Sequence, residues 1–124
     1  MTFNAGDVVT VDFPGVTGIK RRPAVVLSSN TYHINRPDVI VGLITTQTIG
    51  LGVTDYPLQD WSVAGLRVAS IFRSFIVTLQ PSANLLYVGH LSERDWKGVC
   101  ACLKVALAEL DEPNPQPSDL ASSP

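Results

Sequence analysis

Arg22 is the residue of this sequence whose type and position are best suited to chemistry. It stands next to an apolar run, residues 24–27, whose β-branched side chains predict a buried strand. Pro23 cannot donate a ladder hydrogen bond, which fits the first residue of a strand or a strand edge. A guanidinium at the start of a rigid strand offers a planar fork of donors that matches a phosphate. The alternative interpretation is that Arg21 and Arg22 are loop charges that stay in water.

A second polar group ends another predicted strand. Residues 38–44 carry apolar side chains on both faces of an extended chain, which is typical of a central, well-buried strand. This strand ends in three polar residues, Thr45, Thr46 and Gln47. From the residues alone, the hydroxyl of Thr45 could serve a site or could simply cap the end of the strand.

The sequence predicts four more strands around the two that carry Arg22 and Thr45. Alternating apolar and polar residues predict a strand over residues 7–13, and the following segment, residues 15–22, has two glycines and three consecutive cations and is expected to be a mobile loop. Residues 28–37 are expected to be a polar connection. The remaining predicted strands are a short edge strand at 56–58, a bent strand at 70–79 and a last strand at 85–91.

The period of the sequence changes after the last strand. Ser92 and Asp95 resemble a capping box, and apolar residues then recur at helical spacing as far as Leu110. Pro113 is expected to end this helix. Together these elements predict one mainly β domain over residues 1–112, a small and strongly bent antiparallel sheet or barrel with a C-terminal helix. The proline-rich tail, residues 113–124, is expected to be disordered.

Composition narrows the function classes. The formal net charge of the 124 residues is −2, which argues against a general nucleic-acid coat. However, four acidic residues lie from Glu109 onward, where there is no Lys or Arg, so the preceding part has nine basic and seven acidic residues, a net of +2. No signal peptide or membrane-spanning stretch is expected. Cys100 and Cys102 form neither a disulfide framework nor a zinc set, which favours the cytoplasm.

Five segments in order resemble the MazF/PemK family, the toxins of type II toxin–antitoxin systems. The two most specific are residues 6–14 (Gly-Asp-Val-Val-Thr-Val-Asp-Phe-Pro) and residues 22–28 (Arg-Pro-Ala-Val-Val-Leu-Ser). Three shorter segments follow: residues 41–47 (Val-Gly-Leu-Ile-Thr-Thr-Gln), 77–79 (Val-Thr-Leu) and 89–92 (Gly-His-Leu-Ser). The resemblance covers roughly residues 4–110.

The resemblance implies a small SH3-like β-barrel with a C-terminal helix, usually a homodimer. It implies sequence-specific cleavage of single-stranded RNA with no metal and no cofactor. It also implies a cognate antitoxin that lays an acidic segment over the RNA groove.

The resemblance further assigns roles to residues. Arg22 matches the catalytic arginine of the family and Thr45 matches its catalytic threonine. In RNA cleavage by the substrate's own 2′-hydroxyl, such donors counter the charge that develops on the phosphate oxygens. The residues implied to bind RNA are Lys20, Arg21, Thr46, Gln47, Arg73 and Ser74.

The chain departs from the family pattern on the strand before Thr78. Where some members carry an Arg and an Asp, this sequence has Phe72 and Ser74. Arg73 would face the other side of a regular strand, but a bulge that shifts the register could let it serve instead. The missing Asp argues against a carboxylate base and leaves open a weakly active or inactive member.

Other functions and residues stay open on the sequence alone. A gyrase poison of the CcdB type shares the barrel, and a barrel without catalysis could act as a binding module. His33 could act as a general base, although a solvated loop histidine is the commoner case. Trp61, Tyr56 and Phe75 could stack on bases, although aromatic residues of small barrels more often belong to the core.

Overall fold

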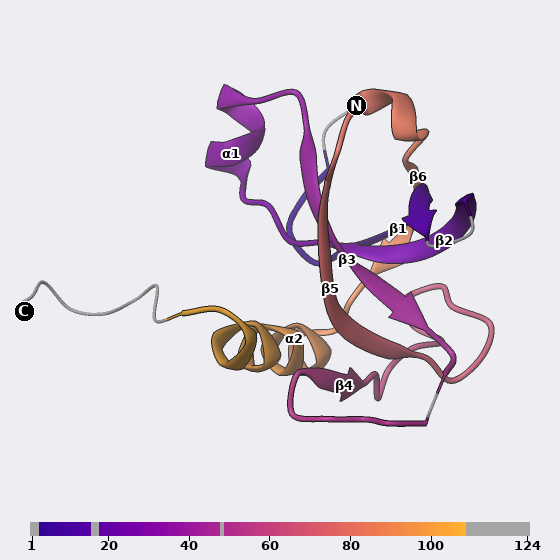
Figure 1. The fold of residues 1–124 in the computed structure, drawn as a ribbon. Coiled ribbons are helices and arrows are strands. Elements are labelled where there is room, and N and C mark those ends of the chain that lie inside the picture. Colours follow the sequence, from indigo (N-terminus) through magenta and orange to yellow (C-terminus); the bar gives the residue numbers. More distant parts are fainter. Residues whose placement is uncertain (1–2, 16–17, 48, 109–124) are drawn as a thin grey trace, which may run out of the picture.

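The computed structural model describes residues 3–15, 18–47 and 49–108 (Figure 1). Its strands form one antiparallel sheet of six strands in the order β4-β5-β3-β2-β1-β6. Along the chain the elements are β1 Asp7–Gly15, β2 Gly18–Val26, α1 Asn30–Asn35, β3 Val39–Thr45, β4 Asp55–Pro57, β5 Ile71–Leu79, the 3-10 helix η1 Pro81–Ala83, β6 Leu86–His90 and α2 Glu93–Ala106. The mainly β architecture with a C-terminal helix, predicted from the sequence, is confirmed. Within the described residues no ladder joins β4 to β6, so both are edge strands.

The basic segment before Ala24 is part of a strand, and the expectation of a mobile loop there was wrong. β1 and β2 form a long hairpin whose register runs from Val8 opposite Val25 to Gly15 opposite Gly18. Pairing with β1 gives the backbone groups of this segment partners that a loop would have to find in water. Arg22 therefore lies inside β2 rather than at its start.

Pro23 fits this strand because of where the next ladder begins. Pairing between β2 and β3 starts at Ala24, opposite Leu43. Pro23 consequently lies where β2 is an edge on the β3 side, and its missing N–H removes no bond from that ladder.

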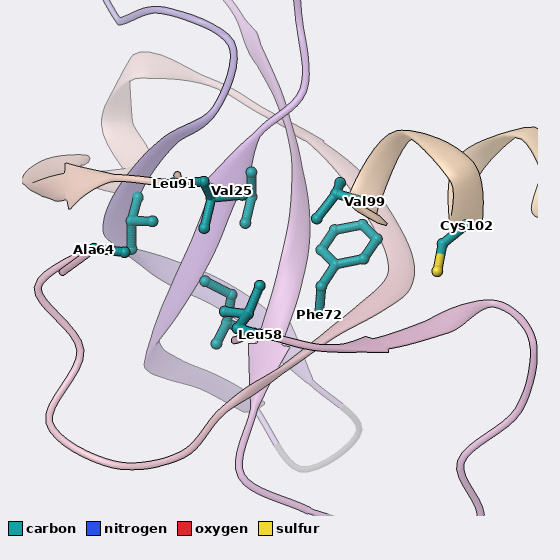
Figure 2. Close-up of a cluster of buried hydrophobic side chains, with 9 residues drawn as sticks. Val25, Leu58, Ala64, Phe72, Leu91, Val99 and Cys102 are labelled. Atoms are coloured by element: carbon teal, nitrogen blue, oxygen red, sulfur yellow. The ribbon is translucent and has the colours of Figure 1, made fainter. Parts of the chain in front are cut away.

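The two faces of the sheet carry separate apolar clusters. One face packs under α2, and we call it the α2 face; Figure 2 shows Phe72 of β5 against Val99 of α2 there. We call the opposite side the Arg22 face, because Arg22 alternates onto it together with Ala24. Its buried cluster consists of Val9, Val11, Phe13, Ala24, Val26, Val41, Leu43 and Leu79.

A buried carboxylate ties the start of α2 to the segment after β4. Ser92 is the N-cap of α2, and its Oγ accepts a hydrogen bond from the Asp95 N–H (3.2 Å) as expected. The Asp95 carboxylate does not complete a capping box. It is fully buried and accepts hydrogen bonds from the Tyr56 hydroxyl (2.9 Å) and from the N–H groups of Gln59 (2.9 Å) and Asp60 (2.8 Å). Gly98 makes this approach possible, because a Cβ atom there would collide with the Tyr56 ring.

Both helices differ from the sequence predictions. α2 ends at Ala106, well before Pro113, and Leu107 already has an extended backbone and is 41% exposed. Leu110 and the predicted disordered tail lie outside the described residues. The predicted polar connection contains α1, whose N-cap Ser29 accepts from the Tyr32 N–H (3.2 Å). No helix in the described part of the chain is long and apolar enough to cross a membrane.

Candidate active site

Arg22 is held at its base by the sheet, and its charged end is free. It lies opposite Val11 in the β1–β2 ladder and is half-buried. Among the described residues, its guanidinium makes no hydrogen bond and no ion pair. A cation that has a fixed backbone and no internal partner is available for an external anion.

Thr45 lies on the Arg22 face, beyond the same end of the β2–β3 ladder as Arg22. It is the last residue of β3 and lies two residues beyond Leu43, just as Arg22 lies two residues before Ala24 in the antiparallel neighbour. The β2–β3 ladder ends at Ala24 opposite Leu43, so Arg22 and Thr45 both lie just beyond the same end of this ladder, on adjacent strands. Because side chains alternate along a strand, both point to the Arg22 face.

The hydroxyl of Thr45 closes a turn, and it donates its own proton to no residue in the described part of the chain. Its Oγ1 accepts a hydrogen bond from the Gln47 N–H (3.2 Å), so it caps the strand end. A hydroxyl that accepts through one lone pair can still donate its hydrogen elsewhere. Capping and donation to a ligand are therefore compatible at this position.

Arg21 has the opposite environment. Its Nη1 donates to Asp12 Oδ1 (3.1 Å) and to the Ala83 carbonyl (3.4 Å), and its Nη2 donates to Thr10 Oγ1 (3.1 Å). Hydrogen bonds from Asn84 and from Arg21 hold the pKa of the Asp12 carboxyl below its usual value. The structure thus places Arg21 in a network of its own on the other side of β2 from Arg22.

β5 contains a bulge of the kind that could bring Arg73 to the face of the site. Pairing shifts between Gly42 opposite Ile76 and Leu43 opposite Arg73, which leaves two extra residues on β5. Arg73 shares the Arg22 face with Leu43, and its Nε donates to Asp55 Oδ1 of β4 (3.2 Å). Phe72, in contrast, is fully buried on the α2 face.

The remaining predicted RNA-binding residues are spread around this position. Ser74 belongs to the bulge, where its Oγ donates to the Thr54 carbonyl (2.8 Å). Lys20 is exposed and lies opposite Phe13, on the Arg22 face. Thr46 and Gln47 are exposed directly after β3.

Sequence reasoning missed two features of the site. One is Asp55, which pairs with Arg73 from 18 residues away and carries no local signal. The other is the edge-to-face contact between Phe13 and Phe75. His33 was expected to be solvated, but it is half-buried on α1 with its Nε2 at 2.5 Å from Ser28 Oγ.

The acidic, histidine and cysteine side chains are dispersed. Within the described ranges there is no group of three or more His, Cys, Asp or Glu side chains that could hold a metal ion. Cys100 and Cys102 are free thiols, and burial raises the pKa of both.

Comparison with known proteins identifies the family. A model of the PemK-like, MazF-like toxins of type II toxin–antitoxin systems matches residues 4–107. The chain belongs to this family. No curated protein matches the MazF-like chain.

Solved structures show the same fold at low sequence identity. A MazE–MazF complex from Deinococcus radiodurans (Form-II) is 21% identical, has a TM-score of 0.69, and the match covers 87% of this chain and 97% of that one. An endoribonuclease in complex with its cognate antitoxin from a mycobacterial species is 19% identical, with a TM-score of 0.68 and coverage of 92% and 100%. The Mycobacterium tuberculosis toxin MazF-mt6 is 22% identical, with a TM-score of 0.66 and coverage of 81% and 94%. The resemblance found in the sequence is thereby confirmed for the MazF family and the MazF fold.

Proposed function

We propose that this chain is a sequence-specific endoribonuclease that cleaves single-stranded RNA without a metal ion. The feature that supports the proposal is that Arg22 and Thr45 lie on one face beyond the same end of the β2–β3 ladder, and that neither the Arg22 guanidinium nor the Thr45 hydroxyl donates a hydrogen bond to any described residue. Membership of a toxin family with structurally similar endoribonucleases supports it.

The two side chains act on the phosphate group that is cleaved. The 2′-hydroxyl of the RNA attacks the adjacent phosphorus and gives its proton to water, while the bond to the 5′-oxygen breaks and that oxygen takes a proton from water. Extra negative charge builds on the non-bridging oxygens during this step. Arg22 donates two parallel hydrogen bonds to them and Thr45 donates one, so both contacts strengthen as the charge develops. The products are a 2′,3′-cyclic phosphate and a 5′-hydroxyl.

The rest of the Arg22 face supplies binding rather than chemistry. Lys20 places a further cation on the face that holds Arg22, where it attracts the RNA backbone, and Arg73 lies on the same face paired with Asp55. The structural neighbours were crystallised with antitoxins, and the proposal includes a cognate antitoxin whose acidic segment competes with RNA for Lys20 and Arg22. The proposal includes a homodimer in the cytoplasm.

Cleavage in the presence of EDTA tests this proposal. We expect the purified protein to cut a mixed-sequence, single-stranded RNA in EDTA and to leave a 2′,3′-cyclic phosphate, identified by mass spectrometry. A magnesium-dependent nuclease in a parallel tube controls for complete chelation. Cleavage that appears only after Mg²⁺ is added, or a product with a 3′-hydroxyl, would contradict the mechanism.

A further inference from the structure

Phe75 is a large apolar side chain that remains half exposed beside the proposed active site. Its ring is 48% exposed, whereas Phe13, which it contacts, is only 2% exposed. The two ring centroids are 5.4 Å apart and the ring planes meet at 81°. One side of the Phe75 ring thus packs against a buried ring, and the exposed part is accessible to a ligand.

The β5 bulge fixes this position. The two residues left without partners on β3 are Ser74 and Phe75. Both the N–H and the hydroxyl of Ser74 donate to the Thr54 carbonyl (3.3 and 2.8 Å). The bulge is therefore held on the β4 side by two hydrogen bonds to one carbonyl, and a bulge re-aims a side chain from the strand that carries it. The exposed position of Phe75 is thus set by β5 itself and by its contact with the segment before β4.

The bulge leaves Phe75 on the same face as the cations. Phe13 lies opposite Lys20, and Val11, two residues earlier on β1, lies opposite Arg22. The ring that touches Phe13 consequently lies against the part of the sheet from which both cations project. Proteins that bind single-stranded nucleic acid combine cations for the backbone with aromatic rings for the bases.

We propose that Phe75 stacks on a nucleobase next to the phosphate held by Arg22. This inference rests on the proposed function for its ligand, single-stranded RNA, and adds a base contact to it. RNA is the occupant that fits both features, because its phosphates suit Lys20 and Arg22, which find no partner in the described part of the chain, and its bases suit the exposed ring.

Binding to two uncleavable oligomers tests the stacking apart from the cleavage. One is a thymidine dodecamer, which lacks the 2′-hydroxyl, and the other is an abasic deoxyribose-phosphate dodecamer of the same charge. We expect Phe75→Leu to weaken binding of the thymidine oligomer roughly tenfold and to leave the abasic oligomer unaffected. Phe75→Trp should keep the affinity. Tyr87→Leu is the matched control, because Tyr87 is also exposed (56%) but lies on the edge strand β6.

Each outcome decides the inference. Equal losses of affinity for both oligomers, no loss for either, or no binding of either oligomer by the unsubstituted protein would overturn it. So would a change of sedimentation coefficient in Phe75→Leu with unchanged oligomer binding, which would make Phe75 an interface between copies. A loss confined to the thymidine oligomer supports stacking even if the protein does not cleave RNA, so the two proposals fail separately.

Discussion

Arg21 and Arg22 are neighbours in the sequence and opposites in the structure. The Arg21 guanidinium donates hydrogen bonds to Asp12, Thr10 and the Ala83 carbonyl, all within the fold. Arg22, one residue later, projects from the other side of β2 and bonds to no group in the described residues. The difference shows how strand alternation assigns one of two identical side chains to structure and leaves the other for a ligand.

The same contrast between adjacent residues is expected at Thr45 and Thr46, and it should give the largest difference in RNA cleavage rate. Thr45→Val removes a donor to the charged phosphate and should slow single-turnover RNA cleavage roughly a hundredfold. Thr46→Val, at the exposed residue after the strand, should change the rate less than threefold, about 0.6 kcal/mol of barrier. The measurement is quenched-flow cleavage at saturating enzyme.

A conservative variant separates the two roles of the Thr45 hydroxyl. Thr45→Ser keeps both the bond from the Gln47 N–H and the donor, and should keep most of the rate. Slow cleavage by Thr45→Ser with an unchanged melting temperature would show that the hydroxyl is not the group of Thr45 that sets the cleavage rate.

A smaller effect is expected on the Arg21 side. Asn84→Ala should raise the pKa of the Asp12 carboxyl towards its ordinary value of 3.8, because the hydrogen bond from Asn84 is the main cause of its lowering. Arg21→Gln should also raise it, and Arg22→Gln should leave it unchanged. The readout is an NMR titration of the Asp12 carboxyl carbon. An equal shift in the Arg22 variant would mean that the two arginines are not separated as described.

The lowered pKa of Asp12 also makes the stability of the fold depend on pH. Because the folded protein holds this proton less tightly than the unfolded chain, the contribution of Asp12 to folding is present above its ordinary pKa of 3.8 and is lost as the pH falls below it. Asp12 is on the surface, so this loss should be small and should shrink further with salt.

Local patterns sufficed for most of the strands. β1 was predicted from the alternation of Val9, Val11 and Phe13, and the end of β2 from the apolar run after Pro23. A strand that buries one face needs apolar residues at every second position, and one that buries both faces needs a continuous apolar run, so both leave a pattern in the sequence. Segments without such a pattern were missed. α1 has no buried residue, and the start of β2 is exposed and carries charges, so neither left an apolar period to read.

Long-range contacts explain the other differences. Asp95 looked like one half of a capping box, but its carboxylate is used by Tyr56, Gln59 and Asp60, which are more than 30 residues away. At the site, family resemblance supplied Arg22 and Thr45, whereas the separation of Arg22 from Arg21 became visible only once the structure showed that both lie in β2. The pairing of Arg73 with Asp55 and the size of the β5 bulge depend on the register between three strands, which no local pattern encodes.

Replacing each arginine by lysine tests the central claim most directly, because it keeps both charges. If Arg22 clamps the phosphate through a planar fork, Arg22→Lys should lower the single-turnover cleavage rate roughly a hundredfold while RNA binding weakens only modestly, since an ammonium cannot form two parallel hydrogen bonds. Arg21→Lys should retain nearly the full rate. Equal and small losses in the two variants would contradict the account and would leave Arg22 as one steering charge among several.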